Sequence, residues 1–282
     1  MPVPFLQSPN VLFDTVVQGT RRLSPGFVRV TLGDPSLADF APYEQDQRIK
    51  ILLPDGLGGY PGGLRGGLAE QEWRRAWRAL PAAERPVMRS YTAHRVRPGR
   101  HELDLDVFVH EPAGPASRWA LEASAGDHLL VSGPDLRRGH PTHGVQWAPE
   151  TATTVLLAAD ETAFPAVDGI LRSLGEEVRA HVILEVGDPS DAALLQPLAA
   201  RHRVEVHERG GRSGGDALVD AVERWLRAHG SSVATLGLGF AAWLVTESTR
   251  VPLLRAATIA RGIDPARVHT QGYWSARPRT TD

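Results

Sequence analysis

The sequence predicts two domains, an antiparallel β-barrel over residues 1–150 followed by a doubly wound α/β domain with a parallel sheet over residues 151–282. Three observations lead to this prediction. The chain of 282 residues is long for one compact domain and suits two domains of about 130–150 residues. Its first half contains short apolar or β-branched runs bounded by Gly and Pro. Its second half alternates apolar runs with helical stretches, which indicates a parallel sheet.

The first half is expected to supply the strands of the barrel. The expected strands span residues 27–32, 48–53, 101–109 and 128–131. Residues 101–109 (HELDLDVFV) carry the clearest pattern, because apolar residues occupy every second position with acidic residues between them. Between the second and third strands, residues 70–80 place Trp73 and Trp77 at helical spacing, which predicts a surface helix docked by its tryptophans.

The second half is expected to form a parallel sheet with helices on both faces. The expected strands span residues 154–159, 178–186, 204–207 and 241–245, and the expected helices span residues 165–174, 192–200, 217–228 and 251–261. Residues 237–242 (GLGFAA) fit a dinucleotide-binding G-x-G-x-x-A fingerprint, which is valid only after a strand and before a helix. Here the fingerprint precedes a strand-like run, so we interpret it as a loop.

Composition excludes several classes of function. The net charge of −2 gives no basic field for nucleic acid, and no run of about 20 apolar residues predicts insertion into a membrane. We therefore expect a cytoplasmic protein. The absence of cysteine excludes disulfides and iron–sulfur clusters, so redox chemistry would need an organic cofactor. The eleven histidines show no HxH or HExxH arrangement, and no metal site is predicted.

Lys50 is the only lysine among 31 basic residues. One interpretation is a coding bias toward arginine that left a single lysine. The other is that this position needs a compact ammonium group instead of a planar guanidinium.

Residues 89–95 (RSYTAHR) form the first motif. They resemble the Arg-x-Tyr-Thr/Ser signature of flavin-binding barrels in ferredoxin-reductase relatives. The arginine can neutralise a pyrophosphate, the tyrosine can stack on an isoalloxazine ring, and the threonine can reach the polar edge of that ring. The alternative is an edge strand with a packed tyrosine. His94 stands where such relatives usually have a second arginine and Arg95 follows it, so either residue could face the cofactor.

Residues 110–120 (HEPAGPASRWA) form the second motif. They are similar to the His-x-x-x-Gly-Pro-Ala-Ser-x-Trp segment of siderophore-interacting proteins. Gly114 permits a close backbone approach, and the amides of Ala116 and Ser117 can donate to a phosphate. Trp119 offers an apolar wall for the adenine side of FAD. The alternative is a Gly-Pro turn before a helix that Ser117 caps.

Two further segments lie in the second half. Residues 158–167 (AADETAFPAV) are similar to the family's Gly-Asp-Glu-Thr-Ala-Leu-Pro-Ala-Ile and lie where the first strand of a parallel sheet ends. Residues 243–247 (WLVTE) and 272–274 (GYW) resemble the closing segments of the family. Val245 and Thr246 replace its Ala-Gly, which affects the expected nicotinamide side more than the flavin side.

The four segments occur in the family's order over the whole chain, so the sequence resembles the siderophore-interacting proteins of the ferredoxin-reductase-like superfamily. The resemblance implies an FAD-dependent reductase that accepts a hydride from NADPH or NADH and passes single electrons to Fe(III) in a siderophore, without a side-chain nucleophile. The implied cofactor-binding residues are Arg89, Ser90, Tyr91, Thr92, His94, Arg95, Val107, His110, Gly114, Pro115, Ala116, Ser117, Trp119, Asp160, Thr162, Ala163, Glu247, Tyr273 and Trp274.

Siderophore complexes are often anionic, so cationic residues are expected to bind the substrate. Lys50 falls on the position of a lysine in the family, and the further candidates are Arg137, Arg138, Arg250 and Arg255. Ferredoxin is an alternative electron donor. A flavin reductase with another acceptor and a non-catalytic ferric-siderophore carrier are the alternative functions. We expect a monomer, since no pattern indicates a dimer interface.

Overall fold

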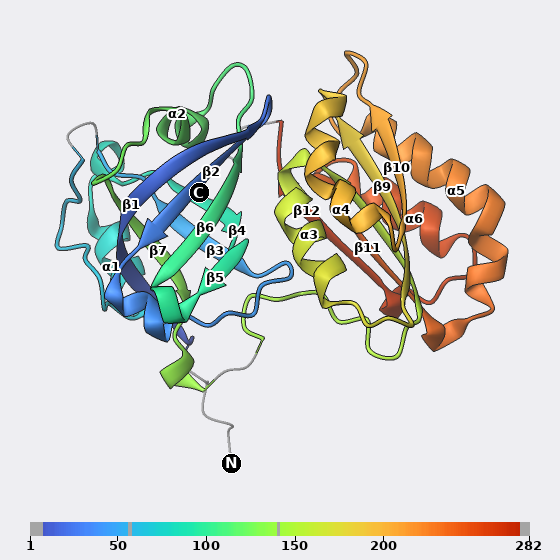
Figure 1. Ribbon diagram of the computed structural model, residues 1–282, viewed down its shortest axis with the longest axis horizontal. Coiled ribbons are helices and arrows are strands. Elements are labelled where there is room, and N and C mark those ends of the chain that lie inside the picture. Colours follow the sequence, from blue (N-terminus) through green and yellow to red (C-terminus); the bar gives the residue numbers. More distant parts are fainter. Residues whose placement is uncertain (1–7, 56–57, 140–141, 277–282) are drawn as a thin grey trace. The chain divides into compact units, whose positions relative to one another are not determined.

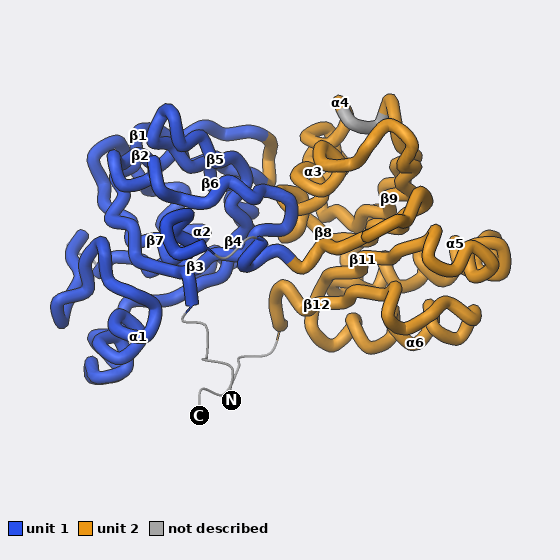
Figure 2. Tube along the Cα trace, turned by 90° about the horizontal axis from the view of Figure 1, so that it is seen from below, with its two compact units in different colours: residues 1–23, 27–145 blue, residues 24–26, 146–282 orange. Residues whose placement is uncertain are grey.

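The computed structural model describes residues 8–55, 58–139 and 142–276, and the chain divides into two compact units (Figures 1 and 2). The first unit comprises residues 1–23 and 27–145, and the second comprises residues 24–26 and 146–282. The short segment 24–26 belongs to the second unit because the hydroxyl of Ser24 and the amide of Gly26 donate to Asp191, over 2.6 and 2.8 Å.

The first unit is built on one seven-stranded sheet, whose paired strands are antiparallel. Its strands are β1 Asn10–Ser24, β2 Phe27–Gly33, β3 Arg48–Leu52, β4 Met88–Thr92, β5 Arg95–Arg97, β6 Glu102–Phe108 and β7 His128–Pro134, in the order β4-β3-β7-β1-β2-β6-β5. Its helices are α1 Glu70–Ala79 and α2 Pro115–Glu122. The expected antiparallel barrel is confirmed.

Two residues between the edge strands close this sheet into a barrel. Ala93 and His94 join β4 to β5, which are the two edges. The amide of Ala93 donates to the carbonyl of Gln47 (2.9 Å), and the amide of His94 donates to the carbonyl of Asp104 in β6 (3.2 Å). Within the described residues no ladder pairs the rest of β4 with β6. The barrel wall is therefore split between these two strands.

The alternation seen in the sequence of β6 separates the two faces of the barrel wall. Leu103, Leu105 and Val107 are fully buried in the barrel core. Asp104 and Asp106 point to the opposite face. The prediction made from the period-2 pattern is thus confirmed.

The predicted helix α1 is also confirmed and docks on the outer face of the barrel through its first tryptophan. Trp73 is fully buried beside Leu52 of β3 and Leu130 of β7, in a second small core. The hydroxyl of Tyr60 donates to the carbonyl of Leu52 (2.8 Å) and accepts from the amide of Leu130 (3.0 Å). This hydroxyl bridges the end of the β3–β7 ladder and fixes the covering segment to the sheet.

The second unit is a parallel five-stranded sheet in the order β10-β9-β8-β11-β12. Its strands are β8 Thr154–Asp160, β9 Arg179–Val186, β10 Arg203–Glu208, β11 Phe240–Glu247 and β12 Val268–Trp274, and its helices are α3 Phe164–Ser173, α4 Gln196–Ala199, α5 Asp216–Ala234 and α6 Val251–Ile259. Figure 2 shows α3 on one face and α5 and α6 on the other. The doubly wound prediction is confirmed.

Several details of the chain differ from the sequence-based expectation. The long strand β1, the short strand β5 and the last strand β12 were not predicted. The expected helix at 192–200 is mostly a 3₁₀ helix, Pro189–Leu195, followed by the single turn of α4. Residues 237–239 form a 3₁₀ turn that leads into β11, so the interpretation of the glycine fingerprint as a loop is confirmed. Among the described residues, no helix is long and apolar enough to cross a membrane.

Candidate functional site

The motif at residues 89–92 forms strand β4, and its side chains divide between the two faces of the barrel wall. Tyr91 pairs with Ile49 and packs against the barrel core. Arg89 pairs with Ile51 and lies on the same face, two residues away. Burial raises the pKa of the Tyr91 hydroxyl to about 12, while the charge of Arg89 acts in the opposite direction. An aromatic ring and a cation thus share one face beside the split in the wall.

The second motif begins helix α2, which packs against β2 and β6. Gly114 precedes the helix and Pro115 is its first residue. The first intrahelical bond runs from the amide of Arg118 to the carbonyl of Gly114 (2.9 Å), so the amides of Ala116 and Ser117 have no acceptor within the helix. Ser117 lies inside the first turn, and the alternative in which it caps the helix is wrong.

Two aromatic residues flank this helix start. A methyl group added at Gly114 would lie 3.6 Å from Nε2 of His110, so the imidazole covers the glycine. Trp119 is half-buried and packs against the barrel core. The helix start therefore combines free amides with an aromatic wall, which is the chemistry that a phosphate next to a flat ring requires.

These features fit FAD. The cofactor needs a flat apolar contact, donors for a pyrophosphate and a backbone edge for its polar ring atoms. Tyr91 and Trp119 offer the flat apolar contact, and Arg89 and the amides of α2 offer donors for the pyrophosphate. The unpaired edges of β4 and β6 offer the backbone groups for the polar ring atoms. The side chain of Val107 is fully buried in the core, so only its backbone can reach a cofactor.

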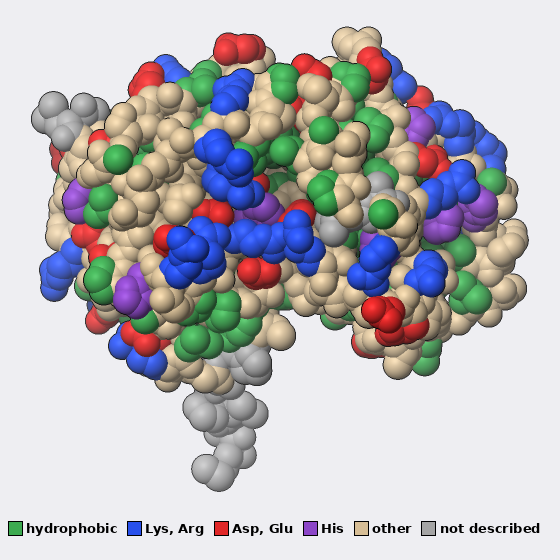
Figure 3. All heavy atoms as spheres, in the orientation of Figure 1, with side chains coloured by type: hydrophobic (Ala, Val, Ile, Leu, Met, Phe, Trp, Pro, Cys, Tyr) green, Lys and Arg blue, Asp and Glu red, His purple; other side chains and the backbone are tan. Residues whose placement is uncertain are grey.

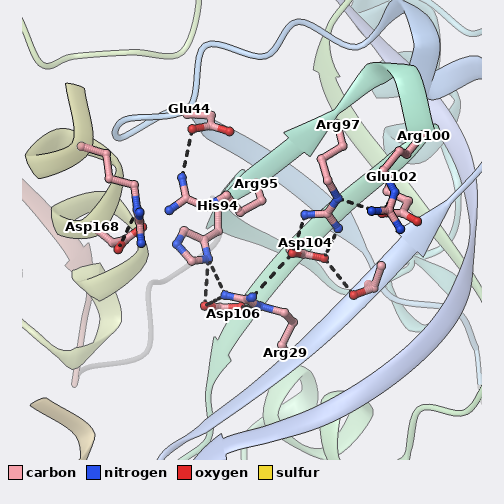
Figure 4. A network of polar contacts seen from close by, with 12 residues as sticks. Arg29, Glu44, His94, Arg95, Arg97, Arg100, Glu102, Asp104, Asp106 and Asp168 are labelled. Carbon is pink, nitrogen blue, oxygen red and sulfur yellow. Dashed lines mark hydrogen bonds and ion pairs between the residues drawn. The ribbon is translucent and has the colours of Figure 1, made fainter. Parts of the chain in front are cut away.

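The two candidates for a second cofactor cation are both held by carboxylates (Figure 4). Nδ1 of His94 lies 2.8 Å from Asp106, whose carboxylate also accepts two hydrogen bonds from Arg29, over 2.6 and 2.8 Å. Burial alone would raise the pKa of Asp106, but these hydrogen bonds outweigh it and lower the pKa. Arg95 donates to Glu44 over 3.0 Å. His94 and Arg95 thus belong to a network of opposite charges.

This network continues along β5 and β6. Arg97 forms two hydrogen bonds of 2.8 Å with Asp104, and burial of that carboxylate is again outweighed, so its pKa is lowered. Figure 3 shows basic and acidic side chains intermixed over the region where Figure 1 labels these strands. The face carries charge of both signs and therefore gives no cationic surface for an anionic substrate.

Lys50 lies on the opposite face of the wall from Tyr91. Its ammonium group donates to the hydroxyl of Ser90, its cross-strand partner. Arg48, which the sequence reasoning missed, donates to the same hydroxyl from Nε (3.3 Å) and Nη2 (3.2 Å). The alternation of side chains along β3 could have identified Arg48, because it puts residues 48 and 50 on one face. Ser90 therefore lies with these cations, on the opposite face from Arg89 and Tyr91 of its own motif.

The two other cations proposed in the first unit are differently placed. Arg137 forms a two-pronged contact with the buried Asp135, the closer prong at 2.7 Å, and lies 3.1 Å from Asp39. Arg138 is 4.0 Å from Asp135. The charge of Arg137 is thus neutralised by two carboxylates.

In the second unit, Asp160 joins three strands at the carboxyl end of the sheet. This fully buried carboxylate accepts hydrogen bonds from the amide and hydroxyl of Thr162 (3.0 and 2.5 Å), the hydroxyl of Thr246 (2.7 Å) and Nε1 of Trp274 (2.8 Å). Thr246 stands where the family has glycine, and its hydroxyl is used to anchor Asp160. Ala163 is fully buried, so Thr162 is the accessible member of that pair.

A buried ion cluster beside Asp160 was missed in the sequence. Arg209 contacts Glu161 and Glu185, the latter over 2.9 Å. Glu185 also accepts from the amides of Gly215 (2.8 Å) and Leu218 (2.9 Å), so it caps helix α5. Burial raises the pKa of Glu161 although Arg209 opposes the shift. The RGGR run at 209–212 was the available signal in the sequence.

The closing segments lie at the same edge of the second sheet, with one exception. Glu247 accepts from the amides of Thr249 (2.7 Å) and Ala276 (3.2 Å). Arg250 donates to Asp216 over 2.6 Å. Tyr273 packs edge-on against Trp243, with ring centroids 5.9 Å apart.

The exception is Arg255. Its guanidinium donates to the carbonyls of Val268 (2.5 Å) and Pro265 (3.2 Å). These carbonyls lie at the beginning of β12, at the amino end of the parallel sheet. The side chain thus fastens α6 to the amino edge of the sheet, and the assignment of Arg255 to substrate binding stays a prediction.

Comparison with known families agrees with this geometry. Residues 16–138 match the family model of the siderophore-interacting FAD-binding domain, and residues 152–277 match that of the siderophore-interacting protein. A solved siderophore utilization protein from T. fusca is 25% identical, with a TM-score of 0.73 over 98% of this chain and 97% of that chain. Reductases of the ferredoxin-reductase type match at 13–14% identity and show the fold alone.

Two curated relatives extend the comparison. The ferric vibriobactin reductase ViuB of Vibrio cholerae is 30% identical over 169 residues, 60% of this chain and 56% of ViuB. The mycobactin import ATP-binding/permease protein IrtA of Mycolicibacterium smegmatis is 31% identical over 262 residues, 92% of this chain and 25% of IrtA. The matched regions thus span between a quarter and about half of these two proteins.

Proposed function

Because this chain belongs to the siderophore-interacting protein family, we propose that it is an FAD-dependent reductase that releases iron from ferric siderophores. One observation carries the proposal. The barrel wall is split between β4 and β6, with Tyr91 and Arg89 on one side of the split and the free amides of helix α2 packed near β6. The activity printed for ViuB, a ferric vibriobactin reductase, supports the same assignment.

The residues of the first unit would hold the cofactor by positioning alone. Tyr91 would contact the flat ring system, and Arg89 together with the amides of Ala116 and Ser117 would bind the pyrophosphate. The backbone of β4 would orient the ring's polar edge. When bound, FAD would supply the conversion between a two-electron donor and one-electron acceptors.

We propose NADPH or NADH as the donor. NAD(P)H gives up two electrons with one hydride, and two ferric ions each take one electron. The products are NAD(P)⁺, one proton and two ferrous ions. Ferrous iron then leaves because hard anionic oxygen donors hold Fe(II) less tightly than Fe(III). The sheet of the second unit would bind the donor at its carboxyl edge, near Thr162 and Trp274.

The test is a visible spectrum of the purified protein after addition of FAD, followed by anaerobic addition of NADPH and then of a ferric siderophore. We expect flavin absorbance that bleaches with NADPH. The absorbance should return as a chromogenic Fe(II) chelator reports two ferrous ions per NADPH. The matched control is a parallel sample without the ferric complex, which should remain bleached.

The other outcomes separate the alternatives. Flavin absorbance that NADPH and NADH leave unchanged would refute the pyridine-nucleotide donor, and reduced ferredoxin would then be added to the same sample. Bleaching without ferrous product would point to a flavin reductase with another acceptor. A protein that retains no flavin absorbance after incubation with FAD and removal of the unbound cofactor would refute the reductase and favour a ferric-siderophore carrier.

A further inference from the structure

The outer face of the sheet β4-β3-β7 changes character from one cross-strand row to the next. Leu52 and Met88 form an apolar row with Leu130, which the segment containing Trp73 covers. The next row is Ser90, Lys50 and Ser132, directly paired across the three strands. The row beyond it pairs Arg48 with Thr92. The face therefore passes from a covered apolar surface to an exposed cationic one within five residues of β3.

Two cations in these rows converge on one hydroxyl. Lys50 and Arg48 both donate to Oγ of Ser90, and Arg48 and Ser90 are exposed. Arg48 forms no ion pair with any carboxylate in the part of the chain that the structure describes. A hydroxyl oxygen carries no net charge, so it does not neutralise the guanidinium as Asp135 and Asp39 neutralise Arg137.

Ser132 supplies a second sign of an incomplete site. This residue lies across from Lys50 and is 2% exposed. Its hydroxyl has no hydrogen-bond partner among residues 8–55, 58–139 and 142–276. Buried polar groups are nearly always paired, and an exception often marks a place that a ligand or water completes. Cations that share an acceptor next to an unpaired hydroxyl are arranged for an anionic guest with several oxygen atoms.

We propose that Arg48 is a second substrate-binding cation, which acts with Lys50 and Ser90 to select ferric chelates of net negative charge. This inference rests on the proposed reductase function. Anionic oxygens of the chelate, of the catecholate or carboxylate type, would replace Ser90 as the acceptor for one or both cations. Arg48 has a planar fork that holds two oxygens, while Lys50 offers a point charge. Uncharged chelates, such as a ferric trihydroxamate, would gain little from either.

The experiment compares two probes, a triply negative ferric tris-catecholate and an uncharged ferric trihydroxamate. Binding of each is measured by equilibrium dialysis with radioactive iron, and reduction is measured through KM and kcat. For Arg48→Gln we expect Kd and KM for the anionic chelate to rise about tenfold, as the loss of one charge-assisted contact implies. Values for the uncharged chelate should stay unchanged, and Arg48→Lys should restore part of the anionic affinity.

One control variant and the outcomes that would contradict the two proposals complete the test. Arg75→Gln removes an exposed positive charge from α1 of the same unit and should leave both probes unaffected. Equal weakening of both chelates by Arg48→Gln, or no weakening of either, would overturn the inference. If the wild-type protein binds the anionic chelate with the expected Arg48 dependence but reduces neither probe, the reductase proposal fails and the anion site stands.

Discussion

At the scale of single residues, β4 shows how neighbouring positions serve different chemistry. Arg89 and Tyr91 point to the core face beside the split in the barrel wall, while Ser90 between them points outward to Lys50 and Arg48. Alternation along a strand makes this division unavoidable. A motif transferred as a block therefore assigns Ser90 to the cofactor, whereas its position in the strand assigns it to the outer face.

The division of β4 side chains between the two faces can be tested by substituting one residue on each face. Arg89→Ala should weaken FAD binding about 10- to 100-fold, because a guanidinium–pyrophosphate contact is charge-assisted and bidentate. Ser90→Ala should leave FAD affinity within about twofold, a change of only ~0.4 kcal/mol. Titration of each apoprotein with FAD, followed by flavin fluorescence, measures both. Equal losses in the two variants would contradict the assignment of faces.

At the scale of secondary structure elements, β6 contributes two buried carboxylates whose charge is needed in the folded state. Asp106→Asn should destabilise the protein by about 2 kcal/mol at neutral pH, since Arg29 and His94 lose their anionic partner. The pKa of Asp106 is lowered on folding. Its stabilisation is therefore complete above the unfolded pKa of about 3.9 and lost as pH falls through the lower folded value.

Urea unfolding at several pH values checks this expectation. The difference between wild type and Asp106→Asn should be constant from about pH 8 to pH 4 and shrink below pH 4. Glu84→Gln, at an exposed carboxylate of the same unit, serves as the control and should change little. A difference that persists undiminished at pH 2 would mean that the shape of the side chain matters and its charge does not.

The elements also show what a sequence pattern can and cannot predict. Strand β6 and four of the five strands of the second unit were predicted because an alternating or continuous apolar run is a local property, whereas β12 was not predicted. Strand β1 was missed because its 15 residues mix polar and apolar side chains, and strand β5 because three residues carry no period.

The position of a side chain within the site depends on pairing between distant segments, which no local pattern encodes. The register of β3 against β4 brings Arg48 to Ser90, and the packing of α6 against β12 takes Arg255 to the opposite edge of the second sheet. The motifs therefore predict which residue types the site needs, while the tertiary pairing decides on which face each individual residue lies.

At the scale of the whole molecule, each unit has its own main core, the first inside the barrel and the second between the parallel sheet and helices α5 and α6. The second core is closed at the amino end of its sheet by Arg267, which is 7% exposed. Its guanidinium donates to the carbonyls of Phe240 (3.0 Å), Pro149 (2.7 Å) and Leu238 (3.1 Å) and pairs with Glu150 (2.7 Å). Arginine alone among side chains offers enough donors for this set.

Separate cores imply that each can be perturbed by itself. Arg267→Ala should destabilise the second unit by about 3 kcal/mol, because it leaves one buried and two part-buried carbonyls without their donor. Hydrogen–deuterium exchange should then be faster in β11 and β12 than in wild type, while β2 and β6 keep their protection. FAD at a hundredfold excess over its Kd should slow exchange in the barrel strands, because it raises their free energy of opening by up to ~2.7 kcal/mol. The exchange rates of β11 should stay unchanged. Arg227→Ala, at an exposed position of α5, is the matched control. Exchange that rises equally in both units of Arg267→Ala would show that the two cores unfold as one.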